Sequence, residues 1–316
     1  MNSLGAMRAT SENDAFQIYL AAKKTVDDRA LNRLVWERLK QLLADEHADQ
    51  AASVLEIGTG IGTMIERIME WELLPAAKIT ALDSSYTNIA QANRRLRSWA
   101  NDHGFEIGQE TNDRLIFTKT GAHFNIQLNT VDFFAFQSDQ IGPLWDLVVA
   151  HAFLDLVDLS SAIGHIFSLL KPGGLFYFTL NFDGLSIFEP AIDPLFDSLV
   201  LDLYHESMDQ RIVKGSPSGD SKTGRHLFET LHSYGGEIAE VGASDWVIYP
   251  QKGKYVHAEA YFLHFTITTI EKQLSHSSAL DQDIFATWIA KRRAQIEQHE
   301  LVYIAHQLDF VGRTPA

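Results

Sequence analysis

Apolar residues recur at intervals of three and four between Ala15 and Ala44, which is the spacing of an amphipathic helix. The pattern predicts two helices that are separated by a break near Thr25-Val26-Asp27. Residues 1–13 are small and polar without a period, so ordered structure is expected to begin near Ala15. The N-terminal part of the chain is therefore predicted to form a helical cap.

Strand and helix patterns alternate from residue 53 onward, and this alternation is typical of a parallel sheet with helices on its faces. Helices are expected at 65–72, 87–101 and 160–170. The expected strands are SVLEIG (53–58), KITALD (78–83), NIQLNTVDFF (125–134), the buried start of WDLVVAHAFLDLV (145–157) and LFYFTLNF (175–182).

Two stretches interrupt this alternation. RLIFTKTGAHFNIQL (114–128) alternates apolar and polar residues on both sides of Thr120-Gly121, which predicts an extra hairpin. Residues 183–226 contain helical pieces and a polar loop, and they follow a core strand at its carboxyl end, where a substrate lid is expected. The remaining pattern predicts a helix at 225–232, a strand at 236–249, a helical stretch at 259–297 and a last strand at 301–311.

The charge of the chain excludes several classes of partner. Lys and Arg number 26 against 41 Asp and Glu, which gives a formal net charge of −15. Nucleic-acid binders neutralise phosphates with clustered cations, and anionic membrane surfaces attract the same clusters, so neither partner is expected. No stretch approaches the roughly 20 apolar residues of a membrane span, and we expect a cytoplasmic protein.

The chain contains no cysteine, which excludes disulfides, thiolate metal sites and cysteine nucleophiles. His205 and Asp209 lie four positions apart on one helical face, where they could bind a metal or a substrate, but a solvated face is the favoured interpretation. The other twelve histidines form no spacing that suggests a set of ligands, so no metal site is predicted.

The candidate chemistry begins in residues 56–62, where a buried strand passes through glycines at alternate positions into a helix. Glycine allows a sharp turn and lets a ligand approach the main chain. The dinucleotide fingerprint would need a glycine at the position of Thr63, and a phosphate-binding P-loop would need Gly-Lys-Ser/Thr. Glu56 favours a cationic ligand, so the loop predicts a cofactor with positive groups and no phosphate.

Acidic residues also end the next two core strands. Asp83, followed by Ser84, is placed to accept both hydroxyls of a ribose. Asp132 adds an acceptor for an adenine amino group, and Phe133 adds a stacking surface. Three acids and a glycine loop at the ends of successive strands predict a nucleoside site.

Together these motifs resemble the class I S-adenosylmethionine-dependent methyltransferases. VLEIGTGIGTM (54–64) is similar to their glycine motif, TALDSS (80–85) to their ribose-binding segment, NTVDFFAF (129–136) to their adenine site and LLKPGGLFYF (169–178) to the segment before their fifth strand. TGRHLFETLHSYGGEIAEVGASDWVI (223–248) is similar to the closing helix and strand of the quinone-methylating type, apart from Gly235-Gly236.

The resemblance implies S-adenosylmethionine as the cofactor and a Rossmann-like α/β fold. We therefore predict a doubly wound, mainly parallel seven-stranded sheet with N-terminal helices and helical lid insertions. Residues 1–50 would form the cap, 51–182 the cofactor-binding core, 183–226 the lid and 227–316 the completion of the core. The cofactor would contact Glu56, Gly58, Thr59, Gly60, Gly62, Asp83, Ser84, Asp132 and Phe133.

His151 follows the fourth core strand, next to where the methyl group would lie, and is the candidate general base. The alternative is that it packs over the cofactor or binds a backbone carbonyl. Further candidates for contacts at the same mouth are Asp155, Asp158, Asn181 and Asp183 after core strands, and Tyr19, Lys23 and Arg29 on the N-terminal helices.

The predicted function is methyl transfer to a small molecule, with the acceptor and the methylated atom left open. One alternative is a protein that keeps the nucleoside pocket but has lost catalysis. A second alternative is an NAD-dependent oxidoreductase, against which the glycine spacing argues. The long amphipathic helices would allow a homodimer without requiring one.

Overall fold

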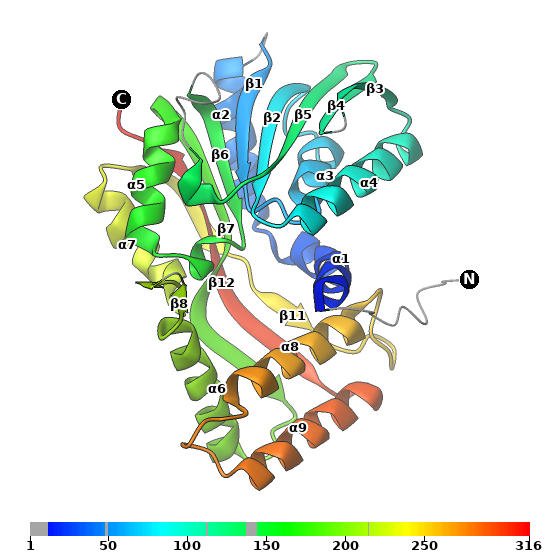
Figure 1. Cartoon of the computed structure of the whole chain (residues 1–316), viewed down its shortest axis with the longest axis vertical. Coiled ribbons are helices and arrows are strands. Elements are labelled where there is room, and N and C mark those ends of the chain that lie inside the picture. Colours follow the sequence, from blue (N-terminus) through cyan, green and yellow to red (C-terminus); the bar gives the residue numbers. More distant parts are fainter. Residues whose placement is uncertain (1–11, 48–49, 112, 137–143, 214) are drawn as a thin grey trace.

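The structure is a computed structural model that describes residues 12–47, 50–111, 113–136, 144–213 and 215–316 (Figure 1). The expectation for residues 1–11 lies outside this part of the chain. A mixed sheet forms the centre, and β11 (Trp246–Ile248) pairs with one of its strands, β12. Across the sheet the other described strands are β10 (Glu237–Ala243), β12 (Val302–Arg313), β7 (Leu170–Glu189), β6 (Trp145–His151), β1 (Ala52–Ile57), β2 (Ala76–Asp83), β5 (Ala122–Thr130), β4 (Arg114–Lys119) and β3 (Glu106–Thr111).

The centre of the sheet is parallel. Strands β7, β6, β1, β2 and β5 run in one direction, and Val54 pairs with Leu147 on one side and with Ile79 on the other. The order reverses around β1, which is the doubly wound arrangement. The predicted mainly parallel, Rossmann-like fold is confirmed. The described sheet also contains β3, β4 and β11 beyond the seven strands of the predicted core.

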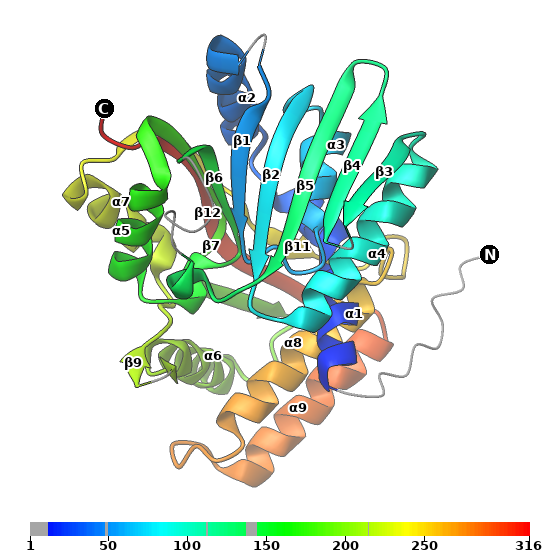
Figure 2. The same cartoon turned by 45° about the horizontal axis from the view of Figure 1, so that its top comes forward.

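Helices cover both faces of the parallel strands (Figures 1 and 2). One face packs against α2 (Arg33–His47), α3 (Thr63–Glu70) and α4 (Tyr86–Asp102). The other packs against α5 (Leu159–Leu169) and α7 (Thr223–Ser233). Because successive side chains of a strand point to opposite faces, Val54 of β1 enters the first core and Leu55 enters the second.

A helical region extends from one end of this core. Strands β7 and β12 pair from Leu175 and Arg313 to Glu189 and Val302, well past the other strands. Their far halves pack against α6 (Pro194–Asp209), α8 (Glu259–Leu274) and α9 (Gln282–Glu297), in the lower half of Figure 1. Buried aromatic and aliphatic side chains from these elements form a separate apolar core, including Phe188, Val200, Phe262, Ile267 and Trp288.

The predicted break in the N-terminal helices is wrong. Thr25, Val26 and Asp27 lie inside one helix, α1 (Glu12–Ala30), and the chain breaks at Leu31-Asn32 instead. Asn32 Oδ1 accepts the N–H groups at positions 34 and 35 at 3.0 and 3.2 Å, so its side chain caps the start of α2.

The predicted end of the fifth strand at residue 182 is also wrong, because pairing with β12 continues β7 to Glu189. The strand expected at 236–249 is two strands, β10 and β11, and the stretch at 259–297 is two helices. The predicted hairpin is confirmed, since β4 and β5 are antiparallel and joined at Thr120-Gly121. The division into four segments stays a prediction.

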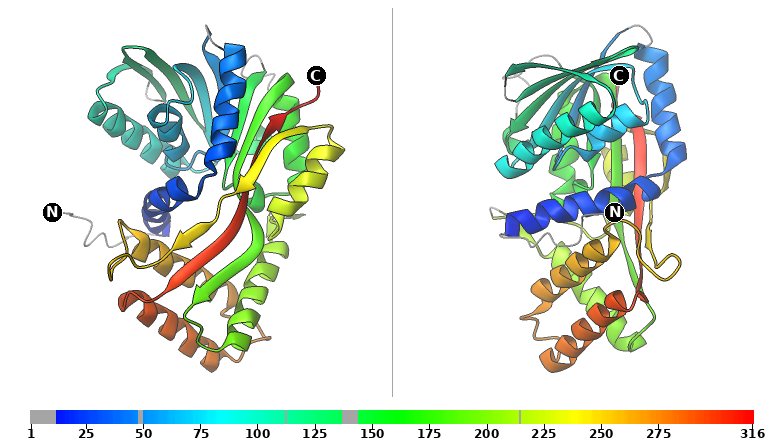
Figure 3. Two further views of the ribbon diagram at one scale, coloured as in Figure 1. Left: turned by 180° about the vertical axis from the view of Figure 1, so that it is seen from behind. Right: turned by 90° about the vertical axis from the view of Figure 1, so that its right-hand side faces the viewer.

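Helix α1 crosses between the sheet core and the helical region (Figure 3). The ring of Tyr19 stacks on those of Phe265 and Phe262, with centroids 4.1 and 5.5 Å apart, so α1 is anchored on α8. None of the helices in the described ranges combines the length and apolarity that a bilayer crossing needs.

Candidate active site

The glycine loop of residues 58–62 follows β1 at the end of the sheet where the parallel strands finish (Figure 2). Gly58 and Gly60 have φ angles of +68° and +54°, which favour glycine. A Cβ on Gly58 would lie 2.7 Å from Cδ2 of Phe153, and one on Gly60 would lie 3.3 Å from Cδ1 of Leu20. Phe153 therefore lies too close to Gly58 for a side chain there, and Leu20 lies in tight contact range of Gly60.

Glu56 is buried just before this loop, with 1% of its surface exposed. Its Oε2 accepts a hydrogen bond from Thr59 Oγ1 at 2.8 Å. Burial raises the pKa of Glu56 to about 8, against the opposing effects of Thr59 and of the Arg67 charge. The carboxyl group is therefore largely neutral near pH 7, and a cation beside it would favour its ionised form.

Asp83 joins the ends of β1 and β2. Its Oδ2 accepts the N–H of Gly60 at 2.9 Å, and its Oδ1 accepts the N–H of Ser85 at 2.8 Å. Burial raises the pKa of Asp83, which these hydrogen bonds partly offset. The carboxylate is half-buried and Ser84 beside it is exposed. Asp83 Oδ1 also accepts from Asn88 Nδ2 at 3.2 Å. Because a carboxylate oxygen has two lone pairs, Oδ2 can still accept one hydroxyl group from a ligand.

Asp132 and Phe133 follow β5, the neighbour of β2. Asp132 Oδ1 accepts the N–H of Phe134 at 3.0 Å. Phe133 is buried, and its ring centroid lies 4.8 Å from that of His165 and 5.6 Å from that of Phe153. Phe134 is 44% exposed. Phe133 therefore packs into the core at this position, and Phe134 offers the more accessible ring.

The structure brings the predicted cofactor residues together along the ends of three neighbouring strands. The hydrogen bond from Gly60 to Asp83 joins two of these strand ends. The contacts of Phe153 with Phe133 and beside Gly58 join the third. The full set is Glu56, Gly58, Thr59, Gly60, Gly62, Asp83, Ser84, Asp132 and Phe133.

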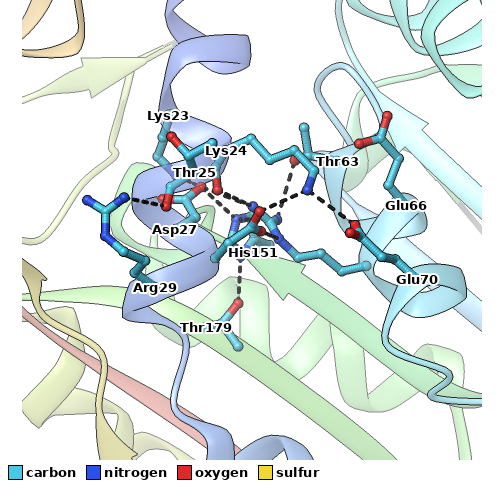
Figure 4. Close-up of polar contacts among 12 residues, drawn as sticks. Lys23, Lys24, Thr25, Asp27, Arg29, Thr63, Glu66, Glu70, His151 and Thr179 are labelled. Atoms are coloured by element: carbon cyan, nitrogen blue, oxygen red, sulfur yellow. Dashed lines mark hydrogen bonds and ion pairs between the residues drawn. The ribbon is translucent and has the colours of Figure 1, made fainter. Parts of the chain in front are cut away.

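His151 ends β6, and both of its ring nitrogens have side-chain partners (Figure 4). Nδ1 lies 2.8 Å from Thr179 Oγ1 on β7. Nε2 lies 3.2 Å from Asp27 Oδ2 on α1 and 3.2 Å from Arg67 Nη1 on α3. Burial lowers the pKa of His151 to about 4, although the hydrogen bond to Asp27 opposes this shift. The imidazole is therefore neutral near pH 7.

Asp27 is the centre of this cluster and is buried. Its Oδ2 lies 2.8 Å from Lys23 Nζ, and its Oδ1 accepts the indole N–H of Trp246 at 2.9 Å. Burial alone would raise the pKa of Asp27, but Lys23 and His151 hold it well below its usual range. An ionised carboxylate thus fastens α1 to the ends of the parallel strands.

Arg67 completes the attachment of α1. Its side chain is fully buried, and its Nε donates to Asp28 Oδ1 at 2.6 Å while its Nη2 donates to the carbonyl of Lys24 at 3.3 Å. Arg67, Asp27 and Thr179 are not among the site residues that the sequence predicts. A charged residue in a helix is usually solvated, so the sequence offered no signal for the burial of Arg67 or Asp27.

Four further residues that the sequence offers as candidates for ligand contacts have partners within the fold. Asp158 caps α5, Asp183 Oδ1 lies 2.8 Å from Arg225 Nε, Asn181 donates to the carbonyl of Leu308 at 2.8 Å and Arg29 pairs with Glu259. These contacts account for the side chains of Asp158, Asp183 and Arg29, whereas Asn181 Oδ1 is buried without a hydrogen-bond partner in the described part of the chain.

Residues 55–176 match the family model described as "Methyltransferase domain". The matched segment runs from β1 into β7, so it contains the glycine loop, Asp83 and His151. This part of the chain is a methyltransferase domain. No curated protein matches the sequence.

The sequence prediction of the class I S-adenosylmethionine-dependent methyltransferases is thereby confirmed, and S-adenosylmethionine is the cofactor of that class. None of the comparisons singles out the quinone-methylating branch.

Solved structures of several methyltransferases and a cyclopropane synthase align with the chain at low identity. Phosphoethanolamine N-methyltransferase 2 from Haemonchus contortus is 12% identical with a TM-score of 0.42, over 98% of this chain and 59% of that protein. Geranyl diphosphate C-methyltransferase from Streptomyces coelicolor is 12% identical with a TM-score of 0.40, over 88% and 76%. A cyclopropane synthase from Mycobacterium tuberculosis is 11% identical with a TM-score of 0.45, over 99% and 100%.

Proposed function

We propose that this chain binds S-adenosylmethionine at the glycine loop and transfers its methyl group to a small molecule. The observation that carries the proposal is the hydrogen bond from Gly60 N–H to Asp83, inside the segment that matches the methyltransferase domain. This contact sets the loop backbone and the carboxylate side by side at the end of the parallel strands, where open α/β sheets bind ligands.

The residues at the carboxyl ends of β1, β2 and β5 fit this cofactor. The positive φ angles of Gly58 and Gly60 allow the sharp turn by which the loop backbone reaches the ends of the strands. Asp83 would accept a ribose hydroxyl at Oδ2, and Asp132 with the adjoining aromatic rings would hold the adenine. The carboxylate form of Glu56 would pair with a positively charged group of the cofactor. When bound, S-adenosylmethionine supplies an electrophilic methyl group on a positively charged sulfur.

The chain would contribute mainly orientation and exclusion of water to the transfer. Leu20 and Phe153 lie beside the loop at Gly60 and Gly58 and would help to exclude water from a bound cofactor. His151 is the proposed general base, because it is neutral near pH 7 and ends the strand beside β1. A proton taken up at Nε2 would lie 3.2 Å from Asp27 Oδ2, whose negative charge favours the imidazolium, and 3.2 Å from Arg67 Nη1, whose positive charge opposes it.

The net charge of −15 supports a small-molecule acceptor over a nucleic acid or an anionic membrane surface. The helical region of α6, α8 and α9 adjoins α1 and would enclose such an acceptor. Dimerisation stays a prediction from the amphipathic helices.

Thermal unfolding with S-adenosylhomocysteine, with NAD as the control ligand, tests the cofactor. At 100 times its dissociation constant a ligand adds about 2.7 kcal/mol of stability, which corresponds to a rise in Tm of about 4 °C for a chain of this size. We expect this rise with S-adenosylhomocysteine, none with NAD, and its loss in Asp83→Ala. The matched control is Asp102→Ala, at the far end of α4. A rise with NAD alone would instead favour the oxidoreductase alternative.

The acceptor class is tested by incubating the chain with methyl-labelled S-adenosylmethionine and a cell extract. The extract is then separated into small molecules, protein and nucleic acid. We expect label among the small molecules. Label confined to protein or nucleic acid would contradict the proposed acceptor class, and the absence of labelled product would favour a catalytically silent binding protein.

A further inference from the structure

Strand β7 contains a β-bulge beside the end of β6. The regular pairing with β12 stops at Phe178 and resumes at Asn181. Thr179 and Leu180 between them face a single residue of β12, Asp309. Leu180 has a φ of +54°, which is uncommon for a residue other than glycine. Because bulges next to active sites often redirect a side chain, the direction of the Thr179 side chain is a feature to be explained.

Neighbouring groups hold this bulge in place. The buried Asp309 accepts the N–H of Leu180 at Oδ1, at a distance of 2.8 Å. The carbonyl of Thr179 accepts the N–H of Ala152 at 2.8 Å, and Ala152 itself has a φ of +49°. A strained residue thus directly follows both His151 on β6 and Thr179 on β7. Strained backbone persists where the surrounding contacts fix it, and such positions concentrate at functional sites.

The bulge brings the hydroxyl group of Thr179 to the imidazole ring of His151 (Figure 4). Thr179 is fully buried, and its Oγ1 lies 2.8 Å from Nδ1 of the ring. In the described part of the chain, Nδ1 has this one hydrogen-bond partner. A hydroxyl group can donate or accept a hydrogen bond, so the contact at Nδ1 alone does not decide which ring nitrogen carries the proton.

The partners of Nε2 complete the argument. Arg67 Nη1 lies 3.2 Å from Nε2, and a guanidinium group only donates hydrogen bonds. Asp27 Oδ2 also lies 3.2 Å from Nε2, and a carboxylate only accepts them. Both oxygens of Asp27 have other donors, Lys23 and Trp246, so Asp27 does not require a proton on Nε2. Nε2 thus has a donor for its lone pair and an acceptor for a proton gained during the reaction.

We propose that Thr179 is a positioning residue that accepts the Nδ1 proton of His151 and so leaves the lone pair on Nε2. The methyl acceptor loses its proton to Nε2 as its bond to the methyl group forms and the carbon–sulfur bond breaks. The ring then carries a proton on each nitrogen, and Thr179 Oγ1 accepts one while Asp27 Oδ2 accepts the other. This inference rests on the proposed function and adds a residue that acts through the base.

Nuclear magnetic resonance measures the tautomer of His151 directly. Two-bond correlations between protons and nitrogens are recorded at pH 7.5 on the full chain with nitrogen-labelled histidine, saturated with S-adenosylhomocysteine, and His151→Asn assigns the signals by removing them. We expect the Nδ1–H tautomer in the unmodified chain. Thr179→Ser keeps a hydroxyl group and should retain this tautomer. Thr179→Val has a similar shape without the hydroxyl group and should shift the ring to the Nε2–H tautomer.

The rate of methyl transfer tests the link to the reaction, with methyl-labelled S-adenosylmethionine and the small-molecule fraction of a cell extract as substrates. Thr179→Val should lower the rate about tenfold or more, because a hydrogen bond to a charged group contributes about that factor. Thr179→Ser should restore most of the rate, and the affinity for S-adenosylhomocysteine should stay unchanged in both. The matched control is Thr118→Val, which removes a hydroxyl group 3.2 Å from Nδ1 of His123 in the outer hairpin and should change neither the rate nor the tautomer of His151.

The outcomes distinguish this inference from the proposed function. Failure of the unmodified chain to bind S-adenosylhomocysteine or to transfer label would overturn the function itself. With binding and transfer intact, the Nε2–H tautomer in the unmodified chain would overturn only the inference, and this measurement decides it even where Thr179→Val does not fold. An unchanged tautomer or an unchanged rate in Thr179→Val would do the same. A Thr179→Ser variant as slow as Thr179→Val would assign Thr179 to packing alone.

Discussion

Asp27 and Asp197 are both buried aspartates that accept a hydrogen bond from a tryptophan indole, yet they lie in different parts of the molecule. Asp27 on α1 accepts from Trp246 at 2.9 Å at the edge of the parallel strands. Asp197 on α6 accepts from Trp288 at 2.5 Å inside the helical region. Each also pairs with a cation, at 2.8 and 2.6 Å respectively. Their local chemistry is therefore nearly the same.

The difference is the third group that each carboxylate meets. Asp27 contacts His151, which ends a parallel strand beside the glycine loop. The other partners of Asp197 are Arg292 and the N–H of Ile192, both within the helical region. A buried ion pair by itself thus indicates structure, and only its position at the carboxyl end of the sheet brings one of the two next to the proposed chemistry.

The strongest test of this contrast is His151→Asn. Loss of a general base is expected to lower kcat at least 100-fold, since such bases contribute about 10²–10⁴-fold. The dissociation constant for S-adenosylhomocysteine should change less than threefold. The matched control is His264→Asn on α8, which pairs with Glu297 and should leave kcat unchanged. A parallel loss of kcat and of S-adenosylhomocysteine affinity in His151→Asn would instead assign His151 to the attachment of α1.

The two aspartates themselves provide the next test. Asp27→Asn and Asp197→Asn each leave a buried cation without its charged partner, so each should lower the free energy of unfolding by about 3 kcal/mol. Chemical denaturation measures this loss. Only Asp27→Asn should also weaken S-adenosylhomocysteine about tenfold, because α1 holds Leu20 against the glycine loop. Equal effects of the two variants on S-adenosylhomocysteine affinity would remove the functional contrast.

The buried carboxyl group of Glu56 provides a third test, in which the expected effect on the free energy of unfolding is smaller. Its buried carboxyl accepts a hydrogen bond from a hydroxyl group, and its pKa rises from an ordinary 4.5 to about 8 on folding. The folded chain then holds this proton more tightly than the unfolded chain, so stability falls as the pH rises between these values. The expected contribution is a loss of about 1.4 kcal/mol per pH unit.

Denaturation of the unmodified chain and of Glu56→Gln at pH 6 and pH 7 measures this contribution as a difference in slope. Glu37→Gln, an exposed substitution on α2, is the matched control and should leave the slope unchanged. A Glu56→Gln variant with the slope of the unmodified chain would show that Glu56 is already ionised in the folded state.

Much of the central fold was predictable because its signals are local. Strand β1 is mainly apolar and is buried between two layers of helices, and Asp83 ends the next strand, as its sequence pattern predicts. The extent of β7 was not predictable, because it depends on pairing of Glu189 with Val302, more than a hundred positions later. The break before α2 was misplaced because Asn32 acts through a cap and not through hydrophobic spacing.

The sequence by itself determined the order of strands and helices and the candidate cofactor residues from Glu56 to Phe133. These follow from the spacing of apolar residues, from glycines that allow positive φ and from acids at strand ends, all of which act within short stretches of chain. The tertiary structure alone decided that α1 crosses the carboxyl ends of the parallel strands and sets Asp27 against His151, and that Arg67 is buried between them. Such meetings depend on packing between elements far apart in the sequence, and no local pattern encodes them.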